Sequence, residues 1–92
     1  MTIDITHNEG AHRYELRLDG DLASIAEYTP SDGHWIFDHT ETEPRFRGQG
    51  LAAKVVAYAL DDVRKRGLRV TPSCAFVADF VRPRPEYGEL VA

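Results

Sequence analysis

The spacing of apolar residues changes once along this chain, at Pro44, and the change limits the folds available to it. Before Pro44, apolar and polar residues alternate, as they do around Tyr14 and Leu16, which is the period of a strand with one buried face. After Pro44, apolar residues recur every three or four positions, which is the period of an amphipathic helix. The pattern therefore predicts a β-sheet in the first half of the chain and helices in the second.

Turn signals divide the first half into four predicted strands. Asp19-Gly20 is a strong signal for a two-residue hairpin, and the Thr-Pro-Ser-Asp-Gly segment 29–33 is a turn cluster. We expect strands at residues 3–6, 12–18, 22–28 and 34–41, joined as an antiparallel meander.

The second half is predicted to alternate helices with one strand. The helical period covers residues 48–66 and ends at three basic residues followed by Gly67, a common stop signal. A short strand at 68–71 follows, and Pro72-Ser73 restarts a helix that runs to Val81. Because a strand-helix-strand unit of this kind is parallel and right-handed, we predict an α/β (α+β) fold of order β-β-β-β-α-β-α with a mixed, twisted sheet.

Length and composition indicate a single domain over residues 1–92. With 42% hydrophobic residues, a chain of this length buries about 60–65% of the surface of its unfolded state. It has no apolar run near about 18 residues, and its first residues lack the basic and apolar regions of a signal peptide. A single cysteine, Cys74, excludes an internal disulfide and fits a reducing compartment. We therefore expect a cytoplasmic protein that does not enter a membrane.

Charge is distributed unevenly along the chain, although the net charge is only −4. Residues 1–44 carry ten acids and two arginines, and residues 45–92 carry nine Arg or Lys and five acids. The basic half is too weakly charged, and too often interrupted by acids, for a nucleic-acid surface. It favours a small ligand that carries phosphate.

The segment Arg45 to Ala52, Arg-Phe-Arg-Gly-Gln-Gly-Leu-Ala, joins the predicted sheet to the predicted helix. Its glycines let backbone approach a ligand closely, and the first N–H groups of a helix lack partners within it, which favours an anion there. A tight turn without any ligand is one alternative. A dinucleotide fingerprint, Gly-x-Gly-x-x-Ala, is another, but it needs an acidic residue about 20 positions on, and residues 71–73 contain none.

Four pieces of the sequence resemble a known family when they are taken together and in order. They are His39-Thr40-Glu41, Arg47-Gly48-Gln49-Gly50-Leu51-Ala52, Pro72-Ser73-Cys74 and Pro85-Glu86-Tyr87. The pattern Arg45-x-x-Gly48-x-Gly50 resembles motif A of the GCN5-related N-acetyltransferases, and the whole set resembles the very small members of that superfamily. The resemblance implies the minimal form of the family's fold, with a splayed cofactor cleft.

The resemblance implies acetyl-coenzyme A as the ligand. The backbone of the glycine loop would take its pyrophosphate, and its pantetheine arm would lie as a pseudo-strand between the strand ending near Glu43 and the strand from Leu68. The family opens this cleft with a bulge in the first of these strands, and Pro44 fits a disrupted strand end because it cannot donate to a ladder. The residues expected to bind the cofactor are Thr42, Glu43, Arg45, Phe46, Arg47, Gly48, Gln49, Gly50, Leu51 and Ala52.

Three residues are candidates for the chemistry. Acetyl transfer needs a neutral amine, and His39 or Glu41 is suited to removing its proton, the alternative being a solvated strand edge. Cys74 lies at a predicted helix start, where the helix dipole lowers a thiol pKa, so it is a candidate nucleophile, proton donor or packing residue. The chain lacks the tyrosine that larger relatives place on the last helix to protonate coenzyme A. With no cysteine pair near its histidines, no metal site is predicted.

Together with the resemblance, these residues predict an acetyl-coenzyme A-dependent N-acetyltransferase in which an amine of a small-molecule or protein acceptor attacks directly. The alternative is a non-catalytic module that binds coenzyme A or acyl-coenzyme A and acts through a partner protein. The helices that bind acceptors in larger relatives are missing, so the acceptor site is either open or completed by a second subunit. The acidic first half favours cationic amines through long-range steering.

Overall fold

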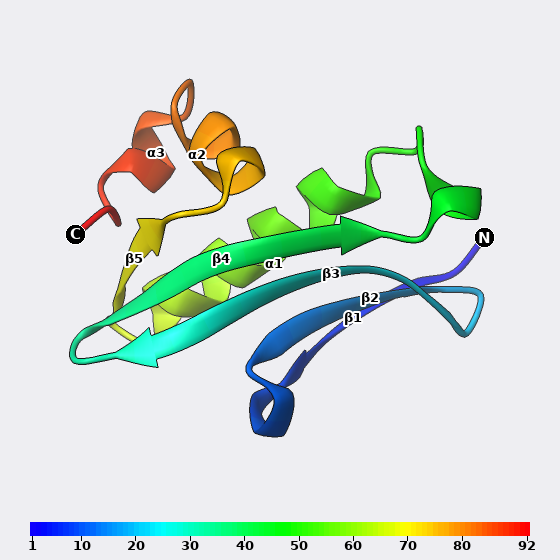
Figure 1. Ribbon diagram of the computed structural model, residues 1–92, viewed down its shortest axis with the longest axis horizontal. Coiled ribbons are helices and arrows are strands. Elements are labelled where there is room, and N and C mark those ends of the chain that lie inside the picture. The colour runs from blue at the N-terminus through cyan, green and yellow to red at the C-terminus, as the bar shows by residue number, and fades with distance from the viewer.

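The computed structural model describes residues 1–92 and contains one five-stranded sheet with three α-helices (Figure 1). The strands are β1 Ile3–Asn8, β2 Arg13–Leu18, β3 Asp21–Ser31, β4 His34–Thr42 and β5 Arg69–Pro72. The α-helices are α1 Leu51–Lys65, α2 Ala75–Val81 and α3 Pro85–Gly88, and two 3-10 turns cover Glu9–Ala11 and Pro44–Phe46. None of these helices is long and apolar enough to cross a bilayer.

The strands follow one another across the sheet in chain order, β1-β2-β3-β4-β5. The first four are antiparallel neighbours, and β5 lies parallel to β4 after the crossover through α1. This arrangement confirms the predicted α+β fold with a mixed sheet. Helix α1 packs on one face of the sheet, and α2 and α3 lie beside it past β5 (Figure 1). The opposite face carries no helix, and we call it the open face; it bears Glu15, Ile25, Glu27, His39 and Glu41.

Several details differ from the predicted boundaries. β3 runs on to Ser31, which pairs with His34, so the turn between β3 and β4 is reduced to Asp32-Gly33. Pro72 ends β5 opposite Phe37 instead of starting a helix, a position that suits proline because the last residue of a strand needs no donor. The short α3 after the proline-rich segment is absent from the prediction.

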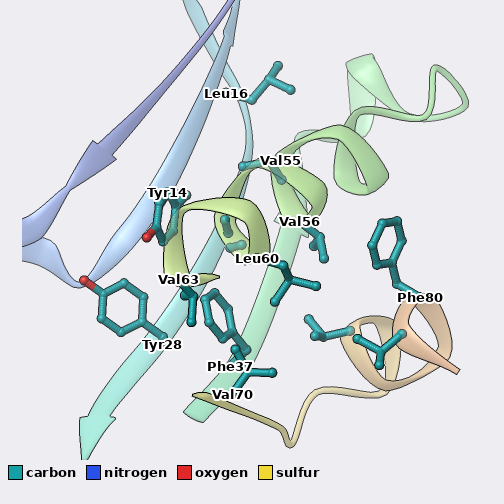
Figure 2. Packing of buried hydrophobic residues seen from close by; sticks show 14 of the residues in the cluster. Tyr14, Leu16, Tyr28, Phe37, Val55, Val56, Leu60, Val63, Val70 and Phe80 are labelled. Carbon is teal, nitrogen blue, oxygen red and sulfur yellow. The ribbon is translucent and has the colours of Figure 1, made fainter. Parts of the chain in front are cut away.

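One hydrophobic core lies between the sheet and α1, and α2 closes its end. Tyr14 and Phe37 are fully buried in it, although an aromatic ring is large. Figure 2 shows the sheet residues Tyr14, Leu16, Tyr28 and Phe37 packed around Val55, Val56, Leu60 and Val63 of α1, with Phe80 of α2 beside them. This core fixes the position of α1, and therefore of the loop that precedes it, relative to β4.

β4 contains one extra residue, Asp38, relative to β3. The residues on either side, Phe37 and His39, pair with consecutive residues of β3, so Asp38 has no partner across this pair. The insertion reverses the alternation of side chains, so that Phe37 and Thr40 face the helices while His39 faces the open side. The bulge expected in this strand therefore lies at Asp38, and Pro44 begins the 3-10 turn after the strand.

Glu15 is a buried carboxylate on the open face, with 5% of its surface exposed. It accepts hydrogen bonds from Arg17 Nη1 at 2.9 Å, Arg13 Nε at 2.7 Å and Asn8 Nδ2 at 3.1 Å. Burial raises the pKa of this carboxyl, but the hydrogen bonds from Arg17, Arg13 and Asn8 outweigh burial and lower the pKa to about 2.

We predict that Glu15 sets part of the acid sensitivity of the fold. Because its pKa is lower in the folded chain than the ordinary value of 4.5, its stabilisation is complete above pH 4.5 and is lost as the pH falls towards 2. Glu15→Gln should remove the part of the stability loss that Glu15 causes between pH 4.5 and pH 2. The free energy of urea unfolding at a series of pH values measures this loss. Glu86→Gln, at an exposed carboxylate, is the control. A Glu15→Gln variant that loses as much stability as the wild type over this interval contradicts the assignment.

Candidate functional site

The loop between β4 and α1 presents six consecutive backbone N–H groups, those of residues 48–53, that have no acceptor within the protein. The first helical bond runs from the Lys54 N–H to the Gly50 carbonyl at 3.3 Å, so the first turn of α1 leaves its donors free. The N–H groups of Phe46 and Arg47 are bonded within the preceding turn. A row of free donors at the positive end of a helix suits an anion.

Gly48 and Gly50 give this loop its shape. Their φ angles are 86° and 72°, a left-handed region that residues with a side chain rarely adopt. A Cβ atom at either position would have no protein atom within 4 Å. Helix α1 therefore begins at Leu51 rather than at the predicted residue 48, and a ligand has room to approach the loop backbone.

A pocket of about 300 Å³ lies against the loop. It is lined by the loop, one strand end and one residue of α2: Thr42, Phe46, Arg47, Gly48, Gly50, Leu51, Ala52, Ala53 and Phe76. Arg45 pairs with Asp21 at 3.2 Å and lies over the Phe46 ring, whereas Arg47 makes no ion pair. The unpaired guanidinium at this pocket is therefore that of Arg47.

β4 and β5 diverge beside this pocket. Their parallel pairing ends at Phe37 and Pro72, and the last backbone–backbone hydrogen bond between the two sides runs from the Cys74 N–H to the Phe37 carbonyl at 2.9 Å. Residues 38–42 of β4 have β3 as their only strand neighbour. Because backbone groups alternate in direction along a strand, every second N–H group of this segment faces the gap. This divergence is the splay that the resemblance to the family implies.

Cys74 lies at the narrow end of the gap as the N-cap of α2. Its half-buried sulfur is 3.6 Å from the Thr40 hydroxyl. Burial raises the pKa of the thiol, but hydrogen bonds from the Val77 N–H, the Thr40 hydroxyl and the Phe76 N–H outweigh burial, so the pKa of Cys74 lies below its ordinary value. The thiol therefore ionises more readily than that of an ordinary cysteine.

His39 and Glu41 lie on the other side of β4 from Cys74. The imidazole Nε2 is 3.2 Å from Glu41 Oε1, and 49% and 63% of the two side chains are exposed. Thr40, between them, faces the helices and contacts Cys74. The structure thus divides the three predicted catalytic residues into a solvent-facing pair and a half-buried thiol, on opposite faces of one strand.

Glu43 lies apart from the glycine loop. Its N–H bonds to the Ala23 carbonyl at 2.8 Å, and its side chain lines a separate depression together with Glu41. Ala53 and Phe76 also line the main pocket, although neither is among the residues expected to bind the cofactor. The distinguishing feature of Phe76 is its exposure of 39%, which is unusual for a large apolar side chain and is visible only in the fold.

Comparison with known sequences agrees with this geometry. The model of a family described as GCN5-related N-acetyl-transferase matches residues 13–90. Protein NATD1 of Bos taurus is 34% identical over 94 aligned residues, which cover 95% of this chain and 80% of that protein. Protein NATD1 of Homo sapiens is 32% identical over 94 aligned residues, with 95% and 80% of the two chains covered.

Solved structures share the fold. The NMR structure of a GCN5-like protein from Staphylococcus aureus superimposes with a TM-score of 0.73 at 19% identity, covering 97% of this chain and 87% of the other. The ribosomal-protein-S18-alanine N-acetyltransferase of Escherichia coli gives a TM-score of 0.64 at 18% identity, covering 77% of this chain and 49% of the other. At these identities the structural similarity shows the fold alone, and the family follows from the sequence match. The chain belongs to the GCN5-related N-acetyltransferase family.

Proposed function

We propose that the protein is an acetyl-coenzyme A-dependent N-acetyltransferase that transfers an acetyl group to an amine. One observation carries the proposal: the six free N–H groups of residues 48–53 border a pocket that reaches Thr42 on β4 and Phe76 on α2, the two sides of the gap. Donors for a pyrophosphate and a gap for an extended arm match the two parts of the cofactor. Membership of the family supports the same assignment.

Acetyl-coenzyme A supplies the activated acetyl thioester, and the chain supplies its binding groups. The N–H groups of residues 48–53 would bind the pyrophosphate, and Arg47 would add a positive charge beside it. The gap-facing backbone groups of residues 38–42 would bond to the amides of the pantetheine arm, in place of the strand that is missing there. Phe76 would cover the apolar part of this arm.

His39 and Glu41 are the proposed groups that remove a proton from the amine. An ammonium group must lose a proton before it attacks, and the exposed imidazole on the open face can accept that proton directly or through water. The Glu41 carboxylate, 3.2 Å from Nε2, stabilises the imidazolium that results. Because both side chains reach solvent, the proton then passes to water. In this arrangement the amine approaches from the open face.

Cys74 is the proposed proton donor to the coenzyme A thiolate that leaves. The nearest alternative in the sequence, Tyr87, donates its hydroxyl proton to Asp61 of α1 at 2.9 Å and is held away from this role. A thiol with a lowered pKa is a better acid than an ordinary cysteine, so Cys74 can protonate the coenzyme A thiolate after direct attack by the amine. A transient acetyl-cysteine is the competing route, and an acetylated protein formed without any amine identifies it.

A non-catalytic coenzyme A module is the second candidate function. The observation that favours it is the open face, which carries no helix to hold an acceptor. Such a module binds acetyl-coenzyme A as the enzyme does, but it acetylates no amine. The two candidates therefore differ in one measurable property, the appearance of acetylated amine.

We predict that Gly48→Val lowers the affinity for acetyl-coenzyme A by about tenfold or more, because a branched side chain occupies the space beside the free donors. Calorimetry measures the affinity, and mass spectrometry of an amine library measures the transfer. Gly20→Val is the matched control, since Gly20 has a φ of 88° and open space but lies in the β2–β3 hairpin. Equal affinity of the two variants removes the loop from the cofactor site. Binding without any acetylated amine supports the non-catalytic module instead.

We predict that Thr40→Val raises the pKa of Cys74, because the sulfur loses one of the hydrogen bonds that stabilise its thiolate. The rate of alkylation by iodoacetamide at neutral pH should fall by about threefold to tenfold, and the midpoint of its pH profile should rise. Thr71→Val on β5 serves as the control of equal volume. A pH midpoint that is the same in all three proteins shows that the hydroxyl does not act on the thiol.

A further inference from the structure

The carboxylates at the end of β4 on the open face are short of positive partners. Arg13 and Arg17 both bind Glu15, at 2.7 Å and 2.9 Å, so the arginines of β2 are already engaged. Glu41 has only the imidazole of His39 as a partner, and Glu43 has no ion pair. This edge of the open face therefore keeps uncompensated negative charge, which attracts a cation.

A depression of about 110 Å³ adjoins these two carboxylates. Leu22 and Ile25 give it an apolar part, and Glu41 and Glu43 lie on its β4 side. Its size suits a few methylene groups and an ammonium head. An alkylammonium group buries its stem against apolar surface and keeps its charge beside a carboxylate, as a lysine side chain does on a protein surface.

The depression lies at a defined distance from the place of transfer. Thr40, which contacts Cys74 at the narrow end of the gap, precedes Glu43 by three residues. At about 3.3 Å per residue of a strand, the two positions are separated by about 10 Å. A linear molecule with an amine at each end can place one amine at the gap and the other at the depression.

We propose that the acceptor is a linear aliphatic diamine or polyamine, with its reacting amine at the gap and its second ammonium between Glu41 and Glu43. This inference rests on the proposed function and adds to it the class of acceptor. The occupant is a small molecule, because one short chain joins the reacting amine to the alkylammonium stem that the depression takes. Glu43 then acts as a specificity residue that binds the substrate away from the reacting atoms.

The experiment compares octamethylenediamine, octylamine and ethylenediamine as acceptors of acetyl from acetyl-coenzyme A. The first two share a chain length and differ in one charge, and the third has two charges but a chain too short for the span. We expect kcat/KM for octamethylenediamine to exceed the other two by about threefold to tenfold at low salt, as for an exposed charge pair. Glu43→Gln should bring octamethylenediamine to the level of octylamine. Asp4→Asn, which removes an equal charge from β1, should keep the wild-type preference.

Amide chemical shifts provide a readout that does not need turnover. Octamethylenediamine should shift the amide signals of Leu22, Ile25 and Glu43 in the wild type and not in Glu43→Gln. If the protein binds acetyl-coenzyme A but has equal kcat/KM for octamethylenediamine and octylamine, this inference is overturned and the proposed function stands. Diamine-induced shifts without any acetylation overturn the transferase and leave the amine-binding surface standing. Acetylation of lysine peptides that depends on Glu43, with no acetylation of diamines, overturns the small-molecule assignment.

Discussion

The geometry of the site depends on one hydrogen bond, from the Cys74 N–H to the Phe37 carbonyl, because it is the last backbone–backbone hydrogen bond between β4 and the chain beyond β5. The extra residue Asp38 follows Phe37 directly, and from there β4 has no partner on its β5 side. Strand N–H and C=O groups without a strand neighbour favour a ligand that supplies one. The same bond fixes the start of α2, which places the thiol at the point where the strands diverge.

Three sides of β4 have a role in the proposed reaction. Its edge faces the gap, its helix-facing side brings Thr40 to Cys74, and its open side carries His39 and Glu41. In that proposal the acetyl donor would lie along the edge and the acceptor would approach from the open side, so the two substrates would meet at one strand without competing for surface.

The sequence predicts the features that local chemistry determines. Alternation around Tyr14 and Leu16 predicts the strands of the meander, and the two glycines after Pro44 predict the loop at the start of α1. The insertion at Asp38 is a property of the pairing between β3 and β4, so the spacing of apolar residues within one strand does not predict it. For the same reason the contact between Thr40 and Cys74, 34 residues apart, appears only in the fold. The free donors of residues 48–53 are implied by the motif but become countable only when every backbone partner is known.

The central claim is that the glycine loop and the diverging part of β4 together bind acetyl-coenzyme A. Hydrogen–deuterium exchange with and without this ligand tests the claim most directly. We expect the ligand to slow exchange in two separate segments: residues 48–53, whose N–H groups lack a protein acceptor, and residues 38–42, which have no strand neighbour on their β5 side. Exchange in the β2–β3 hairpin around Asp19-Gly20 should remain unchanged. Protection of the loop without protection of residues 38–42, or protection of neither, would contradict the assignment of the gap to the ligand.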